Sequence, residues 1–192
     1  MSANLEKIKK LQDLIGKDAA FSEVQYRPFS CLEDLGYRGL PQSVLMQWAG
    51  FGKTELCLQL LRENPEASVA WVEPYITVYP CAFLQRQVAL NRVLFIESRK
   101  YELENLLAEL IRSQVFDFLV VSSELLALPQ LRRLQLLIEK TNSSLIFLSK
   151  QRGMAWPIKL QLQVDSLCGE NSVQVMKSSF SRSFLADNEQ VI

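Results

Sequence analysis

The chain has 192 residues, is 48% apolar and carries 21 basic and 21 acidic residues, so its formal net charge is zero. This length and apolar content suit one compact domain with a substantial core, and zero net charge argues against a surface built mainly to grip nucleic-acid phosphate. The absence of histidine excludes imidazole general-base catalysis and histidine-ligated zinc. Because the four cysteines are widely spaced and no apolar run is long enough to span a bilayer, we expect a cytoplasmic protein with reduced thiols.

The first residues predict a short amphipathic helix. Apolar side chains recur at helical spacing over residues 3–15, among charged ones, at Leu5, Ile8, Leu11 and Ile15. This helix either packs on its own domain or docks on a partner. We assign residues 1–28 to the helix and a linker, residues 29–177 to the core domain, and residues 178–192 to a flexible polar tail.

Strand-like and helix-like segments then alternate along the chain. We expect strands over residues 43–48, 68–73, 92–97, 116–121 and 143–148, and helices over residues 55–63, 80–90, 101–114 and 129–140. Such alternation with apolar strands predicts an α/β fold with a mostly parallel sheet and helices on both faces. After residue 157 the pattern alternates every second residue over 158–165 and 172–177, which predicts a C-terminal antiparallel β-hairpin at the sheet edge.

Residues 50–54 read Gly-Phe-Gly-Lys-Thr and lie between an expected strand and an expected helix, as the end of a phosphate loop does. In such a loop the amides of Gly50 and Gly52 would hold phosphate, and Lys53 would reach its terminal oxygens. Thr54 would coordinate the metal once Mg-nucleotide is bound. The motif therefore indicates a candidate Mg-ATP site.

Three features weaken this candidate site. Gln47 stands where the opening glycine of the loop belongs, Phe51 adds bulk inside the loop, and Glu55 brings a negative charge close to the phosphates. Two unit charges about 6 Å apart repel by roughly 3 kcal/mol at an effective dielectric near 20, comparable to one good charged hydrogen bond. These substitutions favour weak or absent Mg-ATP binding over tight binding.

The order of elements from about residue 29 to residue 177 resembles the RecA-type ATPase core. The segment 35–41, Leu-Gly-Tyr-Arg-Gly-Leu-Pro, looks like the one that leads RecA into its first core strand. A closer similarity is to the ImuA-like relatives of RecA, which are allied to the SulA division inhibitors. Three stretches in matching order carry it: Val-Ala-Trp-Val-Glu-Pro-Tyr at 69–75, Leu-Asn-Arg-Val-Leu-Phe-Ile at 90–96 and Leu-Arg-Arg-Leu-Gln-Leu at 131–136.

This resemblance implies a role in DNA-damage-induced (SOS) mutagenesis by translesion synthesis. The implied partners are an ImuB-like inactive relative of Y-family polymerases, a RecA-like recombinase and an error-prone polymerase. Two alternatives remain open at this point. One is an active RecA-type DNA-dependent ATPase, and the other is a SulA-like cell division inhibitor.

The residues that a RecA-type ATPase needs for hydrolysis are replaced. Ser122 lies where the resemblance implies the metal-binding aspartate, and Tyr75 lies where it implies the catalytic glutamate. Tyrosine is a poor base near neutral pH because its unperturbed pKa is about 10. Glu73 and Glu124 are the nearest acidic substitutes, although each is two positions out of place. We therefore expect a pseudo-ATPase without catalytic residues.

The two segments that RecA uses to grip DNA reduce here to about residues 123–128 and 151–156, so we expect weak or absent DNA contact. The basic residues outside them are more simply solvated helix faces. For partner binding the candidates are apolar side chains in polar surroundings, namely Trp156, Phe180, Phe184 and Leu185. Trp156 has packing over the sheet end as an equal alternative, whereas Trp48 and Trp71 lie on apolar strands and are expected in the core.

Overall fold

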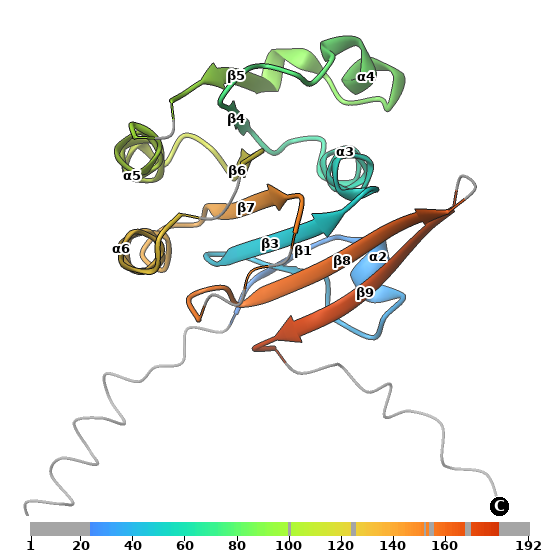
Figure 1. The fold of residues 1–192 in the computed structure, drawn as a ribbon. Helices are drawn as coiled ribbons and strands as arrows, with labels where there is room; N and C mark the ends of the chain where they lie inside the picture. Colours follow the sequence, from blue (N-terminus) through green and yellow to red (C-terminus); the bar gives the residue numbers. More distant parts are fainter. Residues whose placement is uncertain are drawn as a thin grey trace, which may run out of the picture.

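The computed structural model describes residues 24–99, 101–123, 126–151, 153, 156–167 and 170–180. Within these ranges a seven-stranded sheet has the order β5-β4-β6-β7-β3-β8-β9, and a two-stranded sheet pairs β1 with β2 (Figure 1). The strands are β1 (Tyr26–Arg27), β2 (Leu40–Pro41), β3 (Leu45–Gly50), β4 (Val69–Glu73), β5 (Val93–Glu97), β6 (Phe118–Val121), β7 (Ser144–Ser149), β8 (Leu160–Leu167) and β9 (Glu170–Ser178). The helices are α2 (Ser30–Glu33), α3 (Lys53–Glu63), α4 (Pro80–Gln85), the 3-10 helix η1 (Leu90–Arg92), α5 (Leu103–Ser113) and α6 (Leu128–Ile138).

The predicted fold class is confirmed. Strands β3 to β8 pair in parallel with their neighbours, and β9 closes the sheet as the antiparallel partner of β8. Right-handed crossovers place α3 and α4 over one face and α5 and α6 over the other, as Figure 1 shows. In the described residues no helix is both long and apolar enough to cross a membrane.

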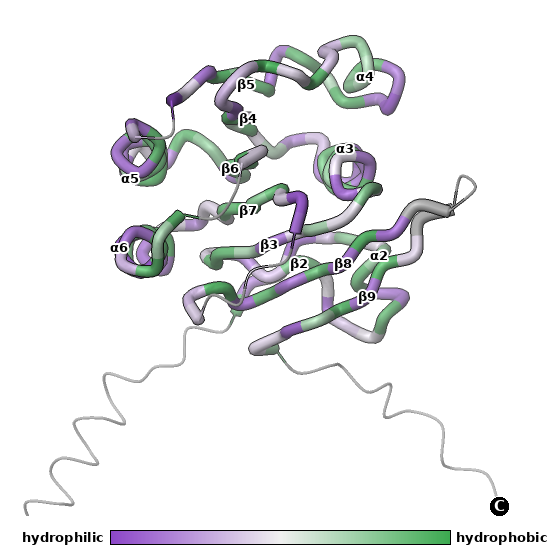
Figure 2. The backbone as a smooth tube through the Cα atoms, viewed as in Figure 1, coloured by the Kyte–Doolittle hydropathy of each residue, from purple (hydrophilic) through white to green (hydrophobic). Residues whose placement is uncertain are grey.

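The central strands are mostly apolar and almost entirely buried because both faces of the sheet are covered (Figure 2). On the side of α3, the core contains Trp48 and Trp71, both almost fully buried, which confirms their expected core positions. On the side of α5 and α6, Leu119 and Phe147 belong to a second core cluster. Two separate cores therefore hold the sheet from opposite faces.

Some element boundaries differ from the sequence expectation. Strand β3 runs two residues further than predicted, to Gly50. The helix expected over 80–90 ends at Gln85, because Gln87 adopts a left-handed φ of 61° that cannot continue a right-handed helix. The β1–β2 pair was not predicted, since strands of two residues are too short to show an alternating pattern.

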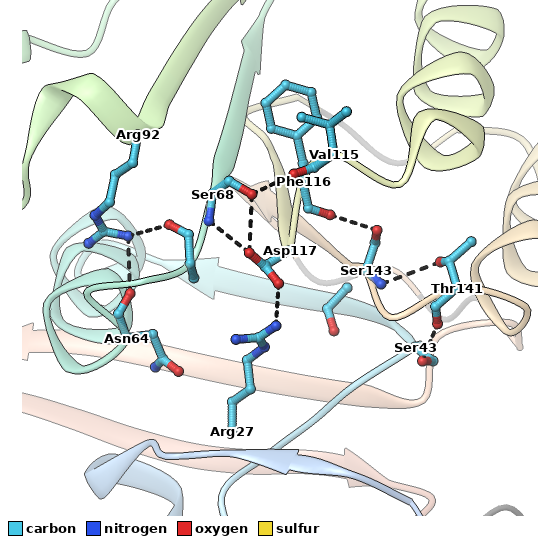
Figure 3. Close-up of polar contacts among 12 residues, drawn as sticks. Arg27, Ser43, Asn64, Ser68, Arg92, Val115, Phe116, Asp117, Thr141 and Ser143 are labelled. Atoms are coloured by element: carbon cyan, nitrogen blue, oxygen red, sulfur yellow. Dashed lines mark hydrogen bonds and ion pairs between the residues drawn. The ribbon is translucent and has the colours of Figure 1, made fainter.

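The amino-terminal end of the sheet is tied together by charged side chains (Figure 3). Arg27 on β1 forms an ion pair with Asp117, just before β6, and that carboxylate also accepts from the Ser68 amide at 2.8 Å. Arg92 donates to the backbone oxygens of Asn64 at 3.1 Å and Ala67 at 2.6 Å, beyond the last turn of α3. Because helix ends and loops leave carbonyls without partners, these contacts fix the segments that precede β4, β5 and β6.

Candidate functional site

The connection from β3 to α3 carries the phosphate-loop motif. Strand β3 pairs on both sides up to its end, with Ala49 opposite Ser149 of β7 and Gly50 opposite Val164 of β8. Because α3 begins at Lys53, only residues 51 and 52 lie between strand and helix. The backbone of residues 47–50, which would wrap a phosphate in a phosphate loop, belongs here to the sheet.

Gly50 is required by the sheet. Its φ is +103°, and a Cβ built at this position would lie 2.0 Å from the backbone oxygen of Val164. Only glycine permits both this conformation and this close approach of β8. The first glycine of the Gly-Phe-Gly-Lys-Thr motif thus has a packing role that the sequence alone did not distinguish from phosphate binding.

Gln47, in the position of the missing opening glycine, is buried on β3 with all its amide atoms bonded. Its Nε2 donates to Ser149 Oγ at 2.8 Å and to the Gln151 backbone oxygen at 3.1 Å. Its Oε1 accepts from the Gly153 amide at 3.2 Å and from Gln161 Nε2 at 2.8 Å. The side chain therefore holds the segment after β7 against the end of the sheet.

The remaining motif residues lie in the first turn of α3. Lys53 Nζ donates to the backbone oxygen of Gly50 at 3.2 Å, so the lysine folds back onto its own strand. Burial, and secondly the charge of Lys150, lower the pKa of Lys53. Thr54 is half-buried, and Glu55 forms an ion pair with Arg86 at 2.5 Å, beyond the end of α4. Lys53 and Lys150 place positive charge at this edge of the sheet, but no phosphate loop surrounds that charge.

Glu73, at the end of β4, is a buried carboxylate with a full set of donors. It accepts from Trp71 Nε1 at 3.0 Å, from the Thr77 amide at 2.5 Å and hydroxyl at 3.1 Å, and from the Val78 amide at 3.2 Å. Burial acts to raise its pKa, but these hydrogen bonds outweigh burial and the pKa is lowered. A carboxylate held in this way orders the loop after β4 and is poorly placed to take a proton from water.

Of the other residues weighed for hydrolysis, Tyr75 and Ser122 lie within the described part of the chain. Tyr75 is 76% exposed, and the Ser122 amide donates to the backbone oxygen of Val72 at 2.9 Å. Glu124 lies outside the described residues. Among the described residues, no group of three or more cysteines, aspartates and glutamates is arranged to hold a metal ion.

A small cavity opens at the ends of β4, β5 and β6. Its volume is about 200 Å³, and its lining includes Val72, Leu103, Val121 and Leu126. Ligand pockets usually measure about 300–1,000 Å³, so this cavity suits a single apolar side chain better than a nucleotide.

Exposed apolar side chains gather on the segment from β4 to α4, which the sequence analysis did not single out. Tyr75 and Tyr79 are 76% and 67% exposed, and Ile76 and Leu84 are also exposed. Single exposed apolar residues are common, but four within ten residues are typical of an interaction surface. The signal in the sequence was the Tyr-Ile-Thr-Val-Tyr run at 75–79, which reads equally well as a strand.

Of the four predicted partner-binding residues, the structure describes Trp156 and Phe180. Trp156 is 63% exposed, and the guanidinium of Arg132 lies 4.7 Å from the centre of its ring. Phe180 is half-buried, edge-on to Tyr26 with ring centres 6.4 Å apart, so this residue packs on its own domain. Phe184 and Leu185 lie outside the described residues.

A comparison with known proteins finds no protein-family model that matches this chain and no similar curated protein.

Proposed function

We propose that this chain is a protein-binding accessory of DNA-damage-induced (SOS) translesion synthesis, with a RecA-like fold and a degenerate ATPase site. Its partner is an ImuB-like inactive polymerase relative, a RecA-like recombinase or an error-prone polymerase, in the bacterial cytoplasm. The observation that carries the proposal is the β3–α3 connection, where sheet pairing up to Gly50 leaves two residues before the helix.

The contacts at this edge support a protein without ATP turnover. Lys53 bonds to the Gly50 carbonyl, and Glu55 is paired with Arg86. The Glu73 carboxylate is saturated by the loop that follows it. Hydrolysis requires a base within hydrogen-bond reach of the attacking water, and these groups are already engaged by the protein.

The exposed segment between β4 and α4 supports a role in protein binding. Tyrosine side chains supply large contact areas at low entropic cost, and they are enriched where protein surfaces meet. Tyr75 and Tyr79 flank a loop whose backbone is fixed by Glu73, so their positions are held before a partner arrives. A fixed loop loses less conformational entropy on binding.

Calorimetric titration with Mg-ATP, together with a hydrolysis assay with and without single-stranded DNA, tests the first half of the proposal. We expect no heat of tight binding and no hydrolysis above background. Hydrolysis that is abolished by Lys53→Ala would contradict the proposal and favour the DNA-dependent ATPase.

Affinity capture from cells treated with a DNA-damaging agent tests the second half. We expect the full chain to retain a polymerase-type or RecA-like protein, identified by mass spectrometry. The Tyr75→Ser/Tyr79→Ser variant should lose it, and the control Val115→Ser, which changes an exposed side chain before β6, should keep it. Cell filamentation on overexpression without DNA damage would instead favour the division inhibitor.

A further inference from the structure

One flank of α6 exposes apolar side chains. The other flank packs beside α5, where Gln130 Nε2 donates to Glu104 at 2.9 Å. Leu128, Arg132 and Leu136 are four residues apart, so they share the flank turned away from α5. Leu128 and Leu136 are 54% and 46% exposed.

Trp156 extends this flank beyond the helix. Its ring lies against Arg132, and Lys177 Nζ of β9 donates to its backbone oxygen at 3.3 Å. A tryptophan that stays largely exposed while its backbone and one ring face are held offers a large apolar area at a fixed position. We refer to Leu128, Leu136 and Trp156 as the α6 flank.

The chain before Val24 starts close to this surface. Val24 lines a groove of about 600 Å³ together with Glu139 and Lys140, the two residues that follow α6. The sequence has 23 residues ahead of Val24. The preceding segment is therefore attached near the carboxyl end of α6.

We propose that residues 3–15 dock on the α6 flank as an amphipathic helix through Leu5, Ile8, Leu11 and Ile15. Gly16 follows the last apolar residue of the stripe and is a helix stop signal. The eight residues 16–23 span up to about 27 Å when extended. Because α6 has 11 residues and rises only about 16 Å, this linker reaches any position along it.

The C-terminal segment fits this surface less well. Phe180 lines the same groove, so residues 181–192 also start near α6. Their large apolar residues fall into two pairs, Phe184–Leu185 and Val191–Ile192, with four polar residues at 187–190 between them, so they form no continuous stripe at i, i+3 and i+4. The N-terminal segment carries a stripe of four apolar residues over three turns, which matches a flank that spans two turns of α6 and one tryptophan.

Collisional quenching of tryptophan fluorescence in the full-length chain tests this docking. Trp48 and Trp71 are buried, so the quencher reports on Trp156 among the three tryptophans. We expect Trp156 to be shielded in the wild-type chain and to become quenchable in Ile8→Ser/Leu11→Ser. The matched control Glu6→Ser/Lys10→Ser changes two residues on the opposite helix face and should leave the shielding intact. The variant Trp156→Phe identifies the part of the fluorescence that comes from Trp156.

The surface itself gives a second measurement that does not depend on the N-terminal variants. Leu136→Ser changes only an exposed side chain of the α6 flank, and it should release Trp156 to the quencher as Ile8→Ser/Leu11→Ser does. The proposal is wrong if Trp156 is fully quenchable in the wild-type chain. It is also wrong if the shielding disappears on dilution together with a halving of the molecular mass, because the segment then docks on a second copy.

Discussion

The connections that follow β3 and β4 leave the same edge of the sheet, each at the carboxyl end of a buried parallel strand. The first has two residues, and Gly50, the last residue of β3 before it, meets the neighbouring strand. The second runs over residues 74–79, and two of its backbone amides donate to the Glu73 carboxylate. It exposes Tyr75 and Tyr79. Ligand sites of α/β proteins lie at this edge, and what each connection can bind depends on how much backbone it leaves unpaired. At the connection after β3 the backbone is paired within the sheet up to Gly50, whereas the connection after β4 presents an exposed surface.

The largest effect is expected from Gly50→Ala, which tests whether sheet pairing closes the first connection. The new Cβ would overlap the Val164 carbonyl at a φ that alanine rarely adopts, so we expect a loss of about 3 kcal/mol or more in the free energy of unfolding. Urea denaturation measures it. Gly52→Ala is the control, because Gly52 has an ordinary φ of −84° and the loss there should stay below about 1 kcal/mol. Equal losses at both glycines would contradict the close approach of β8.

Glu73→Gln tests whether one carboxylate holds the second connection. The amide places a donor among groups that already donate, so we expect a loss of about 2–3 kcal/mol at pH 7. Because the pKa of Glu73 is lowered in the folded state, its contribution is present above the pKa of the unfolded chain, about 4.3, and disappears as the pH falls through the lower folded value. Denaturation curves of the wild type and of Glu73→Gln at neutral and acidic pH measure whether the difference between their free energies of unfolding disappears in acid.

The matched control for that measurement is Glu97→Gln, at the end of the neighbouring strand β5. Glu97 is opposite Glu73 in the sheet register but exposed, so the same substitution should change the free energy of unfolding by less than about 0.5 kcal/mol. A similar loss at both positions would show that the hydrogen bonds of Glu73 do not add to the free energy of unfolding.

Gln47→Leu tests whether the Gln47 side chain holds the segment after β7 against the end of β3. It leaves the Gly153 amide without its acceptor and removes one of the two acceptors of Gln161 Nε2, so we expect a loss of about 2 kcal/mol and faster hydrogen exchange at the Gly153 amide. Gln163→Leu is the control, since Gln163 is half-buried and its Nε2 donates at 3.1 Å to Asp165 within its own strand. Unchanged exchange at Gly153 would contradict the role given to Gln47.

The smallest effect is expected from Lys53→Ala. Its hydrogen bond to the Gly50 carbonyl is long and partly exposed, so the free energy of unfolding should change by less than about 0.5 kcal/mol. We expect Mg-ATP to leave the thermal midpoint unchanged in the wild type and in Lys53→Ala, because a ligand raises the midpoint only by binding the folded state. A midpoint raised by Mg-ATP in the wild type alone would show that the first connection still binds nucleotide.

Much of the fold was predictable because the central strands are mostly apolar and the helices are periodic. The parallel sheet, its two covered faces and the closing hairpin follow from these patterns. The candidate site was less predictable. The Tyr-Ile-Thr-Val-Tyr run at 75–79 reads equally well as a strand. Only in the structure do the Thr77 and Val78 amides donate to Glu73, in a loop that leaves Tyr75 and Tyr79 exposed.

The sequence by itself determined that this chain forms an α/β sheet with two apolar cores, and that it carries the residues Gly-Lys-Thr at 52–54 after a buried strand. Only the tertiary structure decided what those residues do. A phosphate loop requires backbone amides that are free to bind, and the amides of residues 47–50 gain or lose that freedom through the strands that pair beside them. Here β7 and β8 pair with β3 to its end, and Gln47 and Gly50 serve the sheet.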